Sequence, residues 1–308
     1  MRRIAALVAP LVLIAMGLSA CGTQTAAQSG PIRLKDDMGH TITLKKPAVR
    51  IVSLGPSNTE TLLALGLRKD IVGIDDESVL YAPPPYAQEA KGLRIVGDSY
   101  TGLNVEKIAG LHPQLILAIP GVKDLKEMQA LGVPIATLEP ANLAGVEKDI
   151  AFIADAAGVP QKGQQAVQKM RNEVAAIAAA VRKATAKPSV YVELDPTYYS
   201  AGPGSFLNAI VKIAGGRNIA DSIATTAYPQ LSAESIIQAN PQAIVLLDTP
   251  QASAAKVQAR PGWSSIQAVK DGRIYANINP DYLSQPAPAL VTGLALLAKD
   301  LHPGLRIP

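Results

Sequence analysis

Residues 103–117 read LNVEKIAGLHPQLIL, and residues 231–245 read LSAESIIQANPQAIV. The two stretches align without a gap, because each residue of the first lies 128 positions before its counterpart in the second. Each copy predicts a polar helix cap, a short helix, a proline break and a buried strand. Since an internal repeat indicates duplicated architecture, the sequence predicts two lobes of similar design.

Short apolar runs alternate with helical stretches on both sides of this repeat. A small hairpin is expected over 33–44, where apolar and polar residues alternate on either side of a turn. Because strands that alternate with helices favour parallel sheets, we expect an α/β fold. The strand candidates are 51–54, 71–74, 115–118 and 135–137 in the first half, and 190–194, 243–247 and 274–275 in the second.

The longest helical pattern runs from Pro160 to Lys187. At ~1.5 Å per residue, such a helix would span roughly 40 Å, which is enough to bridge two lobes. Its spacing is equally compatible with an amphipathic helix inside one domain. Its apolar positions recur at intervals of three and four, at Val167, Met170, Val174, Ile177 and Val181.

The composition excludes several classes of protein. The 308 residues are 48% hydrophobic and 18% charged, which is typical of a globular chain with a large core. A net charge of +4 without a cluster of lysine and arginine argues against a nucleic-acid partner. The three histidines, His40, His112 and His302, form no recognisable triad or zinc motif, so we expect no enzymatic activity, no metal and no cofactor.

The N-terminus has the parts of a secretory signal. Arg2 and Arg3 precede an apolar stretch, and 18–21 then read LSAC. This ending resembles a bacterial lipobox, which implies a signal peptide over 1–20, cleavage before Cys21 and lipid on its sulfur. Residues 21–31 are then a flexible lipidated tether. An ordinary signal with a chance cysteine is the alternative; since Cys21 is the only cysteine, no intrachain disulfide can form.

Further motifs accompany the repeat: RIVSLGPSNTE at 50–60, LG at 65–66, IVG at 71–73, AGPGSF at 201–206 and RPGW at 260–263. Together they resemble the helical-backbone substrate-binding proteins of ABC importers, and most closely the cobalamin-binding members beside the siderophore and haem binders. The resemblance implies two Rossmann-like lobes with parallel sheets, joined by one long rigid helix, with a ligand cleft between them. It places the lobes at 32–145 and 188–308, and the linking helices, including the long one, at 146–187.

Tyrosines indicate the kind of ligand. Most of the nine tyrosines fall in predicted loops, and a phenol ring offers a flat apolar face with a polar tip, which suits a wide, partly polar ligand. For any single tyrosine, packing of a surface loop is the alternative. Tyr100 and Tyr228 are equivalent under the repeat. The resemblance implies ligand contacts at Tyr81, Tyr100, Tyr199, Tyr228, Asp281 and Tyr282.

Residues 285–289 read QPAPA, where family members commonly carry two arginines. Arginine pairs strongly with carboxylates, so this departure weakens the case for haem propionates or acidic siderophores. We therefore expect an exported, lipid-anchored monomer that captures cobalamin or a related corrinoid and delivers it to a membrane permease with ATPase subunits. The same role for a ferric siderophore or haem is the alternative.

Glu106 and Glu234 lie in the first turns of the repeated helices, where the helix dipole alone favours an acid. The resemblance implies that they pair with arginines on the permease. A lipid-anchored hydrolase using Ser205 or Asp281 is the rival of a different class, although a helix cap also explains Ser205.

Three other groups of residues are expected to be structural. Trp263 is expected to be a packing anchor. Residues 57–60, SNTE, are expected to form a capping box that starts the first helix, and 75–77, DDE, to form a solvated loop.

Overall fold

The computed structural model describes residues 30–84, 86–247 and 253–308. The predicted signal peptide, Cys21 and all but the last residues of the predicted tether lie outside this description. Within the described part, no helix combines the length and the apolar character that a membrane crossing would require. Residues 31–308 group together as one unit, which the following paragraphs describe.

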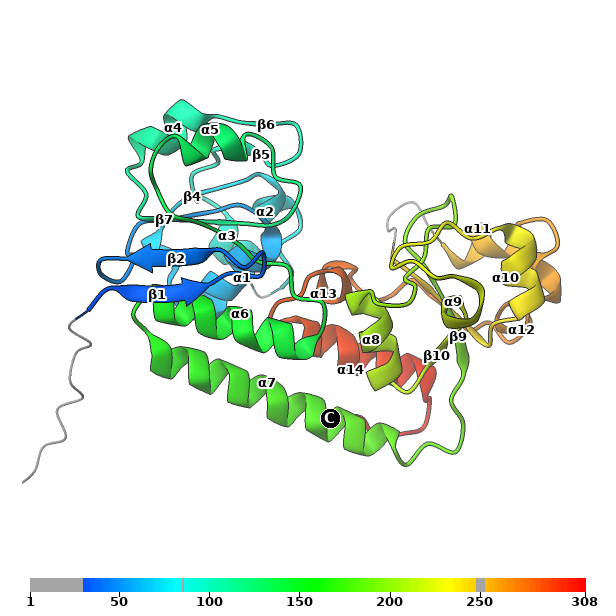
Figure 1. Ribbon diagram of the computed structural model, residues 1–308. Helices are drawn as coiled ribbons and strands as arrows, with labels where there is room; N and C mark the ends of the chain where they lie inside the picture. The colour runs from blue at the N-terminus through cyan, green and yellow to red at the C-terminus, as the bar shows by residue number, and fades with distance from the viewer. Residues whose placement is uncertain (1–29, 85, 248–252) are drawn as a thin grey trace, which may run out of the picture. The chain divides into compact units, whose positions relative to one another are not determined.

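Two four-stranded parallel sheets form the centres of two lobes (Figure 1). In the first lobe the strand order is β4 (Ile71–Ile74), β3 (Ile51–Ser53), β7 (Leu115–Ala118) and β8 (Ile135–Thr137). In the second lobe the order is β10 (Arg217–Asn218), β9 (Ser189–Glu193), β11 (Ala243–Leu246) and β12 (Ile274–Tyr275). All neighbouring strands in both sheets are parallel, which confirms the α/β prediction.

Two short antiparallel hairpins complete the strands. The first pairs β1 (Ile32–Lys35) with β2 (Thr41–Leu44), as the alternating sequence predicts, and buries Ile42 and Leu44 on one face. The second pairs β5 (Gly97–Asp98) with β6 (Gly102–Leu103), and it ends at the first residue of the first copy of the repeat.

Helices surround both sheets. Two short 3₁₀ turns lie at Arg68–Asp70 and Trp263–Ser265. The helices of the first lobe and its connections are α1 (Pro56–Ala64), α2 (Glu77–Leu80), α3 (Ala87–Ala90), α4 (Val105–Gly110), α5 (Leu125–Gln129), α6 (Leu143–Ala156) and α7 (Pro160–Val181). Those that follow are α8 (Phe206–Ile213), α9 (Ala220–Ile223), α10 (Ala233–Ala239), α11 (Ala254–Gln258), α12 (Gln267–Lys270), α13 (Asp281–Ser284) and α14 (Leu290–Leu301).

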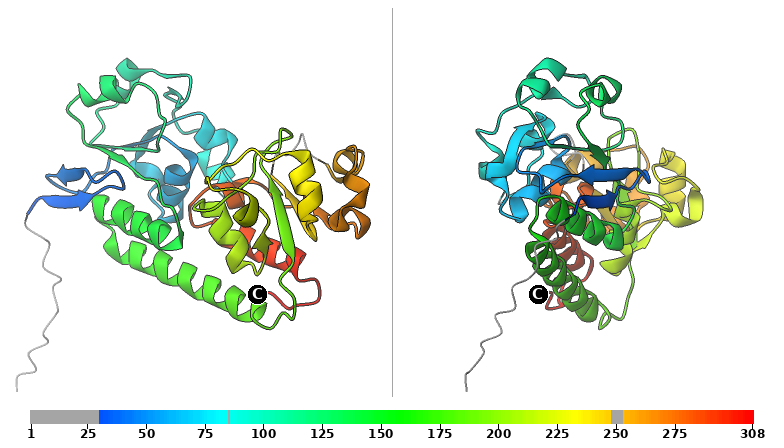
Figure 2. Two further views of the ribbon diagram at one scale, coloured as in Figure 1. Left: turned by 45° about the vertical axis from the view of Figure 1, so that its right-hand side comes forward. Right: turned by 60° about the vertical axis from the view of Figure 1, so that its left-hand side comes forward.

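The long helix α7 packs along α6 and then along α14, so it touches elements of both halves of the chain (Figures 1 and 2). Its narrow apolar stripe is confirmed, since Met170, Ile177 and Val181 are buried. The helix ends at Val181, earlier than the predicted Lys187. Pro188 disfavours helical backbone at the residue before it, so the chain must leave the helix ahead of the proline.

The repeat has the same local geometry in both lobes. Asn104 caps α4 by accepting a hydrogen bond from the backbone N–H of Lys107 at 2.7 Å, and Ser232 caps α10 by accepting one from Ser235 at 3.1 Å. Ser235 also returns a bond to the cap, which makes a reciprocal capping box with serine in place of the usual acid.

The turn after each repeated helix is also duplicated. His112 and Asn240 both adopt left-handed backbone, with φ of 46° and 45°. After the following proline, the N–H of Gln114 donates to the carbonyl of Arg50, and that of Gln242 donates to Ser189, both at 2.8 Å. In both lobes the turn therefore leads into a sheet strand that begins beside the same position of the neighbouring strand.

The start of α1 differs from the prediction. The helix begins at Pro56 after Gly55, whose φ is 118°, and no side chain caps it. Gly55 is required because a Cβ there would lie 2.7 Å from a methyl group of Ile119. Since proline at the first position supplies the helical φ, Ser57 lies inside the helix, and the predicted capping box is wrong.

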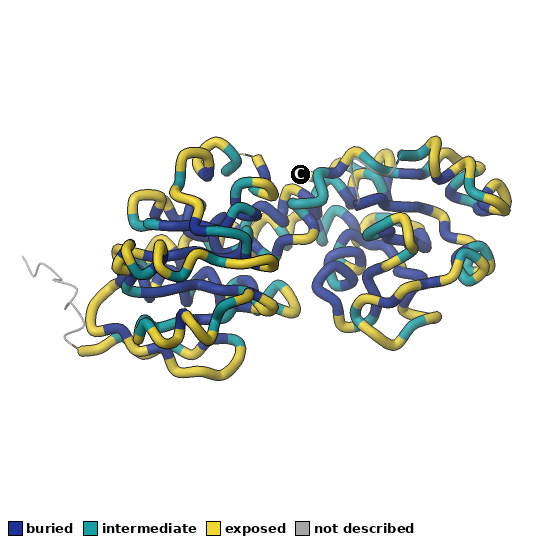
Figure 3. The backbone as a smooth tube through the Cα atoms, turned by 90° about the horizontal axis from the view of Figure 1, so that it is seen from above, coloured by how far each residue is buried: buried dark blue, intermediate teal, exposed yellow. Residues whose placement is uncertain are grey.

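Each sheet separates two apolar layers. Along β3, Ile51 belongs to a core that continues through α6, α7 and α14 into the second lobe, whereas Val52 belongs to a core confined to the first lobe. Along β9, Val192 faces the shared core and Tyr191 faces a core confined to the second lobe. Figure 3 shows the strands as buried segments between more exposed helices. The lobe boundaries expected at 145 and 188 stay a prediction.

Candidate functional site

A cavity of about 1340 Å³ lies between the segments that follow the strands of both sheets, and we refer to it as the interlobe cavity. Its position agrees with the rule that open parallel sheets bind ligands beyond the carboxyl ends of their strands. The first lobe contributes Pro56, Ser57, Leu80, Tyr81, Tyr100, Ile119, Pro120, Leu138, Glu139 and Pro140. The remaining lining residues are Leu194, Phe206, Leu207, Tyr228, Leu247, Ala276, Asn277, Ile278, Asn279, Pro280, Asp281, Leu283, Ser284, Gln285 and Pro286.

Tyr100 and Tyr228 both line this cavity, one from each lobe, and are 51% and 58% exposed. The N–H groups of Tyr100 and Thr101 each donate to Oδ1 of Asp98 at 2.7 Å, which fixes the loop under the first ring. Burial raises the pKa of both phenols. Two large rings left this exposed on facing segments are typical of a binding surface.

The other predicted ligand residues divide into two groups. Tyr81 and Asp281 line the interlobe cavity, and burial raises the pKa of Asp281. Tyr199 and Tyr282 do not belong to its lining. Tyr199 forms an isolated antiparallel bridge with Gln230, and the hydroxyl of Tyr282 donates to the carbonyl of Pro84 at 2.9 Å. Ligand contact by any of these residues stays a prediction.

Three hydrogen bonds connect α13 and the segment that follows it to the first lobe. Besides the bond from Tyr282, Nε2 of Gln285 donates to the carbonyl of Tyr81 at 2.5 Å. The N–H of Ala289 donates to Oε1 of Glu60 at 2.6 Å. Gln285 and Ala289 stand where the resemblance leads one to expect arginines, and here Gln285 contacts the first lobe through its side chain and Ala289 through its backbone.

Glu60 is an unusual group that sequence reasoning missed. It is 2% exposed, and its Oε2 has no hydrogen-bond partner within the described part of the chain. Burial, with a contribution from Asp281, raises its pKa to about 8, so the carboxyl is protonated at neutral pH. From its position in the sequence, Glu60 was expected to belong to a capping box. Only its contact with Ala289 shows that it has another role.

Asp75 and Glu77 are buried, so the prediction that 75–77 form a solvated loop is wrong. Oδ2 of Asp75 accepts a hydrogen bond from the hydroxyl of Ser99 at 2.6 Å, and its Oδ1 accepts one from Ser78. Glu77 accepts from the N–H of Ser99 at 3.2 Å, and burial raises its pKa to about 7. Hydroxyl donors replace water here, which is why the chain can turn inward beneath Tyr100.

Carboxylate oxygens of Asp76, Glu77 and Asp98 lie within 4.8 Å of one another, so these three could hold a cation. The hydrogen bonds that Asp98 and Glu77 accept from backbone N–H groups account for their arrangement without one. The expectation that the protein holds no metal stays a prediction.

The second lobe supports its loops with an ion pair. Arg260 donates to both carboxylate oxygens of Glu193, at 2.5 and 2.7 Å, and Glu193 is fully buried. The guanidinium also lies over the rings of Tyr198 and Trp263, at 5.2 and 4.5 Å from their centroids. Trp263 is fully buried, which confirms that it is a packing anchor.

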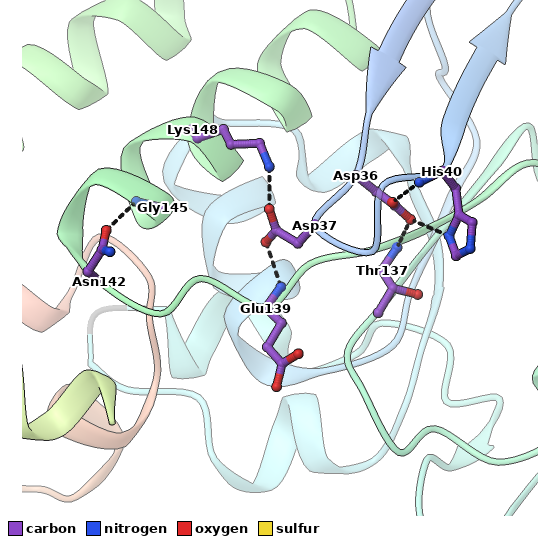
Figure 4. A network of polar contacts seen from close by, with 8 residues as sticks. All are labelled: Asp36, Asp37, His40, Thr137, Glu139, Asn142, Gly145 and Lys148. Carbon is purple, nitrogen blue, oxygen red and sulfur yellow. Dashed lines mark hydrogen bonds and ion pairs between the residues drawn. The ribbon is translucent and has the colours of Figure 1, made fainter. Parts of the chain in front are cut away.

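The charged groups among the described lining residues of the interlobe cavity are Glu139 and Asp281, and no lysine, arginine or histidine is among them. Sequence reasoning missed Glu139, because nothing in its neighbourhood marks it. Figure 4 shows how its backbone is held: the N–H of Glu139 donates to Oδ2 of Asp37 at 2.7 Å, and Asp37 pairs with Lys148.

The remaining predicted residues lie away from the interlobe cavity. Glu106 and Glu234 are exposed in the first turns of α4 and α10, as predicted, and docking through them stays a prediction. The hydroxyl of Ser205 donates to the carbonyl of Gly202 at 2.8 Å and accepts from the N–H of Asn208. Ser205 therefore caps α8, as the structural interpretation predicts.

Residues 51–278 match the family model described as periplasmic binding protein. The chain belongs to the periplasmic binding protein family. It is 32% identical to the uncharacterized ABC transporter substrate-binding lipoprotein YvrC of Bacillus subtilis, over 98% of each chain. It is also 32% identical to a cobalamin-binding protein of Halobacterium salinarum, covering 90% of this chain and 75% of that one.

Solved structures of periplasmic binding proteins agree with this assignment. The vitamin B12 binding protein BtuF of Vibrio cholerae has a TM-score of 0.69 and 26% identity, over 83% of this chain and 97% of that one. The haem-binding protein RhuT of Roseiflexus sp. RS-1 in apo form has a TM-score of 0.72 and 28% identity, over 82% and 97%. The periplasmic binding protein described here is thus an extracytoplasmic substrate-binding component of an ABC importer, with a small-molecule ligand and a permease as partners.

Proposed function

We propose that this protein captures a cobalamin-type corrinoid in the interlobe cavity and delivers it to the permease. The observation that carries the proposal is the pair of exposed rings, Tyr100 and Tyr228, that the two lobes present to a cavity whose described charged lining groups are acidic. The cobalamin-binding relative in Halobacterium salinarum and the similarity to the Vibrio cholerae protein support it.

The chemistry of the cavity fits such a ligand. A corrinoid is a wide, flat molecule whose rim carries neutral amide groups, so it needs aromatic faces and hydrogen-bond partners rather than counter-ions. At about 1340 Å³ the cavity exceeds the ~300–1000 Å³ of ordinary drug-sized sites. Asn277, Asn279 and Gln285 add amide side chains to the lining.

The acidic lining disfavours anionic ligands. Haem propionates and siderophore carboxylates would meet Glu139 and Asp281 without a described lysine or arginine to pair with. Like charges facing each other across a partly desolvated site are repulsive by several kcal/mol at most. The absence of arginine at 285 and 289 also disfavours the binding of anionic ligands.

Haem is the second candidate. Tyrosine can ligate haem iron, and Tyr81, Tyr100 and Tyr228 present three phenols to the cavity. The similarity to the haem-binding protein of Roseiflexus favours this candidate.

One experiment separates the candidates. The purified protein is mixed in turn with cyanocobalamin, haemin and a ferric siderophore, and each mixture is passed over a gel-filtration column. We expect the cyanocobalamin chromophore to elute with the protein at a 1:1 ratio. Elution of haemin or siderophore with the protein, without cyanocobalamin, would contradict the corrinoid proposal and leave the substrate-binding role intact.

We propose further that Glu106 and Glu234 dock the two lobes onto the permease. Both are exposed, and neither has an ion-pair partner within the described residues. Replacing both by Ala should leave ligand affinity unchanged and abolish uptake into cells or proteoliposomes. The matched control replaces Glu127 and Asp271, two other exposed acids, by Ala and should preserve uptake. Loss of ligand binding in the Glu106/Glu234 variant would refute the docking role.

Lipid anchoring is proposed on the LSAC sequence and on the description of the Bacillus relative as a lipoprotein. We also propose that the protein is a monomer and catalyses no reaction. Cys21→Ser should move the protein from the membrane fraction to the soluble fraction after cell lysis. If the variant stays in the membrane fraction, lipid on Cys21 is not the anchor.

A further inference from the structure

We propose that Glu139 is a specificity-determining residue that selects ligands with amide groups over ligands with carboxylates at one wall of the interlobe cavity. The inference rests on the proposed function, because it concerns the side groups of a corrinoid bound there. Neither the sequence motifs nor the family comparison draws attention to this residue.

The position of Glu139 is set by the edge of the first sheet. It follows β8, the last strand in the order, by two residues, so it emerges at the carboxyl end of the sheet and lines the cavity. Leu138 before it is buried, and Pro140 after it also lines the cavity. The segment therefore forms part of the wall, and Glu139 is its exposed polar member.

The hairpin between β1 and β2 fixes the backbone of this segment at two points. Oδ2 of Asp36, which is 2% exposed, accepts from the N–H of Thr137 at 3.1 Å. Oδ2 of Asp37 accepts from the N–H of Glu139 at 2.7 Å. Because both acceptors are charged, these are the stronger kind of backbone hydrogen bond.

The same network leaves the side chain of Glu139 unpaired. Lys148, the cation drawn in this network, is engaged by Asp37 (Figure 4). Figure 4 shows the Glu139 carboxylate pointing away from the network, and no described residue donates a hydrogen bond to it or forms an ion pair with it. A recognition group needs a backbone that is held in place and a side chain that is free to bind, and Glu139 has both.

The field of Glu139 reaches the opposite lobe. Besides burial, the negative charge of Glu139 raises the pKa of Tyr228, which lies on the second lobe. A ligand group that enters the cavity meets the unpaired carboxylate of Glu139 from the first lobe and the phenol ring of Tyr228 from the second. An amide N–H can donate to that carboxylate, whereas a ligand carboxylate in the same place is repelled.

The test compares cyanocobalamin with its monocarboxylate derivatives, in which one amide of the ring rim has been hydrolysed. We expect the wild-type protein to bind cyanocobalamin about tenfold more tightly than at least one of these derivatives, measured by intrinsic fluorescence or calorimetry. Glu139→Gln keeps the size of the side chain and should reduce this preference to about twofold, and Glu139→Lys should reverse it. The matched control Glu127→Gln, an exposed acid on α5, should keep the wild-type preference.

The outcomes distinguish this inference from the proposed function. If the wild-type protein binds no corrinoid, the proposed function fails before any variant is compared, and the role of Glu139 in corrinoid selection fails with it. If the wild-type protein binds cyanocobalamin but Glu139→Gln and Glu139→Lys both keep the wild-type preference, the proposed function stands and the role of Glu139 is overturned. Melting temperatures of the variants verify that each is folded.

Discussion

The two lobes repeat one scaffold and support it with different chemistry. In both lobes a side chain caps the repeated helix, a left-handed residue ends it, and an exposed tyrosine precedes it. Beneath Tyr100, however, the first lobe buries Asp75 and Glu77 against hydroxyl and backbone donors. The second lobe instead buries an ion pair. The geometry of the repeat thus places the rings, while the groups that support the loops can differ.

The difference predicts that the two lobes respond differently to pH. Burial raises the pKa of Glu77 to about 7 and that of Glu60 to about 8, so these carboxyls of the first lobe titrate near neutrality. Burial alone would lower the pKa of Arg260, but hydrogen bonding to Glu193 and the charge of Glu193 raise it, so this guanidinium of the second lobe stays charged throughout this range.

The largest effect is expected from the ion pair of the second lobe. Arg260→Ala leaves the buried carboxylate of Glu193 without its partner, which should lower the free energy of unfolding by about 3–5 kcal/mol. Urea denaturation followed by circular dichroism measures the change. The control Arg171→Ala breaks the more exposed pair with Glu147 and should cost about 1 kcal/mol or less. Equal losses in the two variants would show that burial does not distinguish the pairs.

The next effect concerns Glu60 and pH. Because the pKa of Glu60 is about 8 in the folded protein and 4.5 for a glutamate in water, the folded state holds a proton that the unfolded chain has lost. The stability associated with this proton is complete below pH 4.5 and is lost as the pH rises through about 8. The loss amounts to about 4 kcal/mol between pH 5 and 9, because each unit of the pKa shift from 4.5 to about 8 corresponds to ~1.4 kcal/mol.

Glu60→Gln removes this titration while keeping an oxygen that can accept from Ala289. Relative to the wild type, the variant should therefore become more stable as the pH rises from 5 to 9, as measured by urea denaturation at each pH. Asp149→Asn removes a second buried acid with a pKa of about 8. This variant tests whether Asp149 also contributes to the dependence of the unfolding free energy on pH. A constant difference between Glu60→Gln and wild type over this range would mean that Glu60 is ionised in the folded protein.

A smaller effect is expected for the two rings related by the repeat. Tyr100→Ala and Tyr228→Ala should each weaken binding of cyanocobalamin by about tenfold, because each removes one aromatic face from the cavity. Tyr199→Ala is the matched control, since Tyr199 is also exposed but lies outside the lining, and it should change affinity by less than about twofold. A large loss in Tyr199→Ala would favour the assignment implied by the family resemblance over the one implied by the cavity.

The smallest effect is expected on the pKa of Tyr228 in the second lobe when Glu139 of the first lobe is replaced, with no ligand present. Glu139→Gln removes a negative charge that raises the pKa of Tyr228, so that pKa should fall. Absorbance titration of the phenols at alkaline pH measures it, with Tyr228→Phe identifying the contribution of Tyr228. An unchanged titration would place the two side chains too far apart to interact.

The sequence predicted the elements whose signals are local. The strands at 115–118 and 243–246 and the caps at Asn104 and Ser232 were readable because apolar runs and capping residues act within a few positions. Tyr100 and Tyr228 were predicted from the family resemblance, the repeat relates them to each other, and the structure brings them to one cavity.

The sequence could not predict features that depend on distant partners. Glu60 reads as a cap until Ala289 is placed beside it, and Glu139 has no signal until Asp37 and the cavity are known. The segment 75–77 reads as a solvated loop because it consists of three acids, but hydroxyl groups of Ser78 and Ser99 satisfy Asp75 and allow it to be buried. In each case the deciding interaction joins residues that no periodicity relates.

The bond between Glu60 and Ala289 also bears on how the chain matures. The two residues are 229 positions apart, so almost the whole protein must be synthesised and exported before the acceptor in the first helix meets its donor. Until then this carboxyl is hydrated and ionised, and it must take up a proton when the segment that carries Ala289 packs against it. This contact between the two halves can therefore form only late in the making of the chain, and a chain that ended before Ala289 would leave the buried carboxyl of Glu60 without its backbone donor.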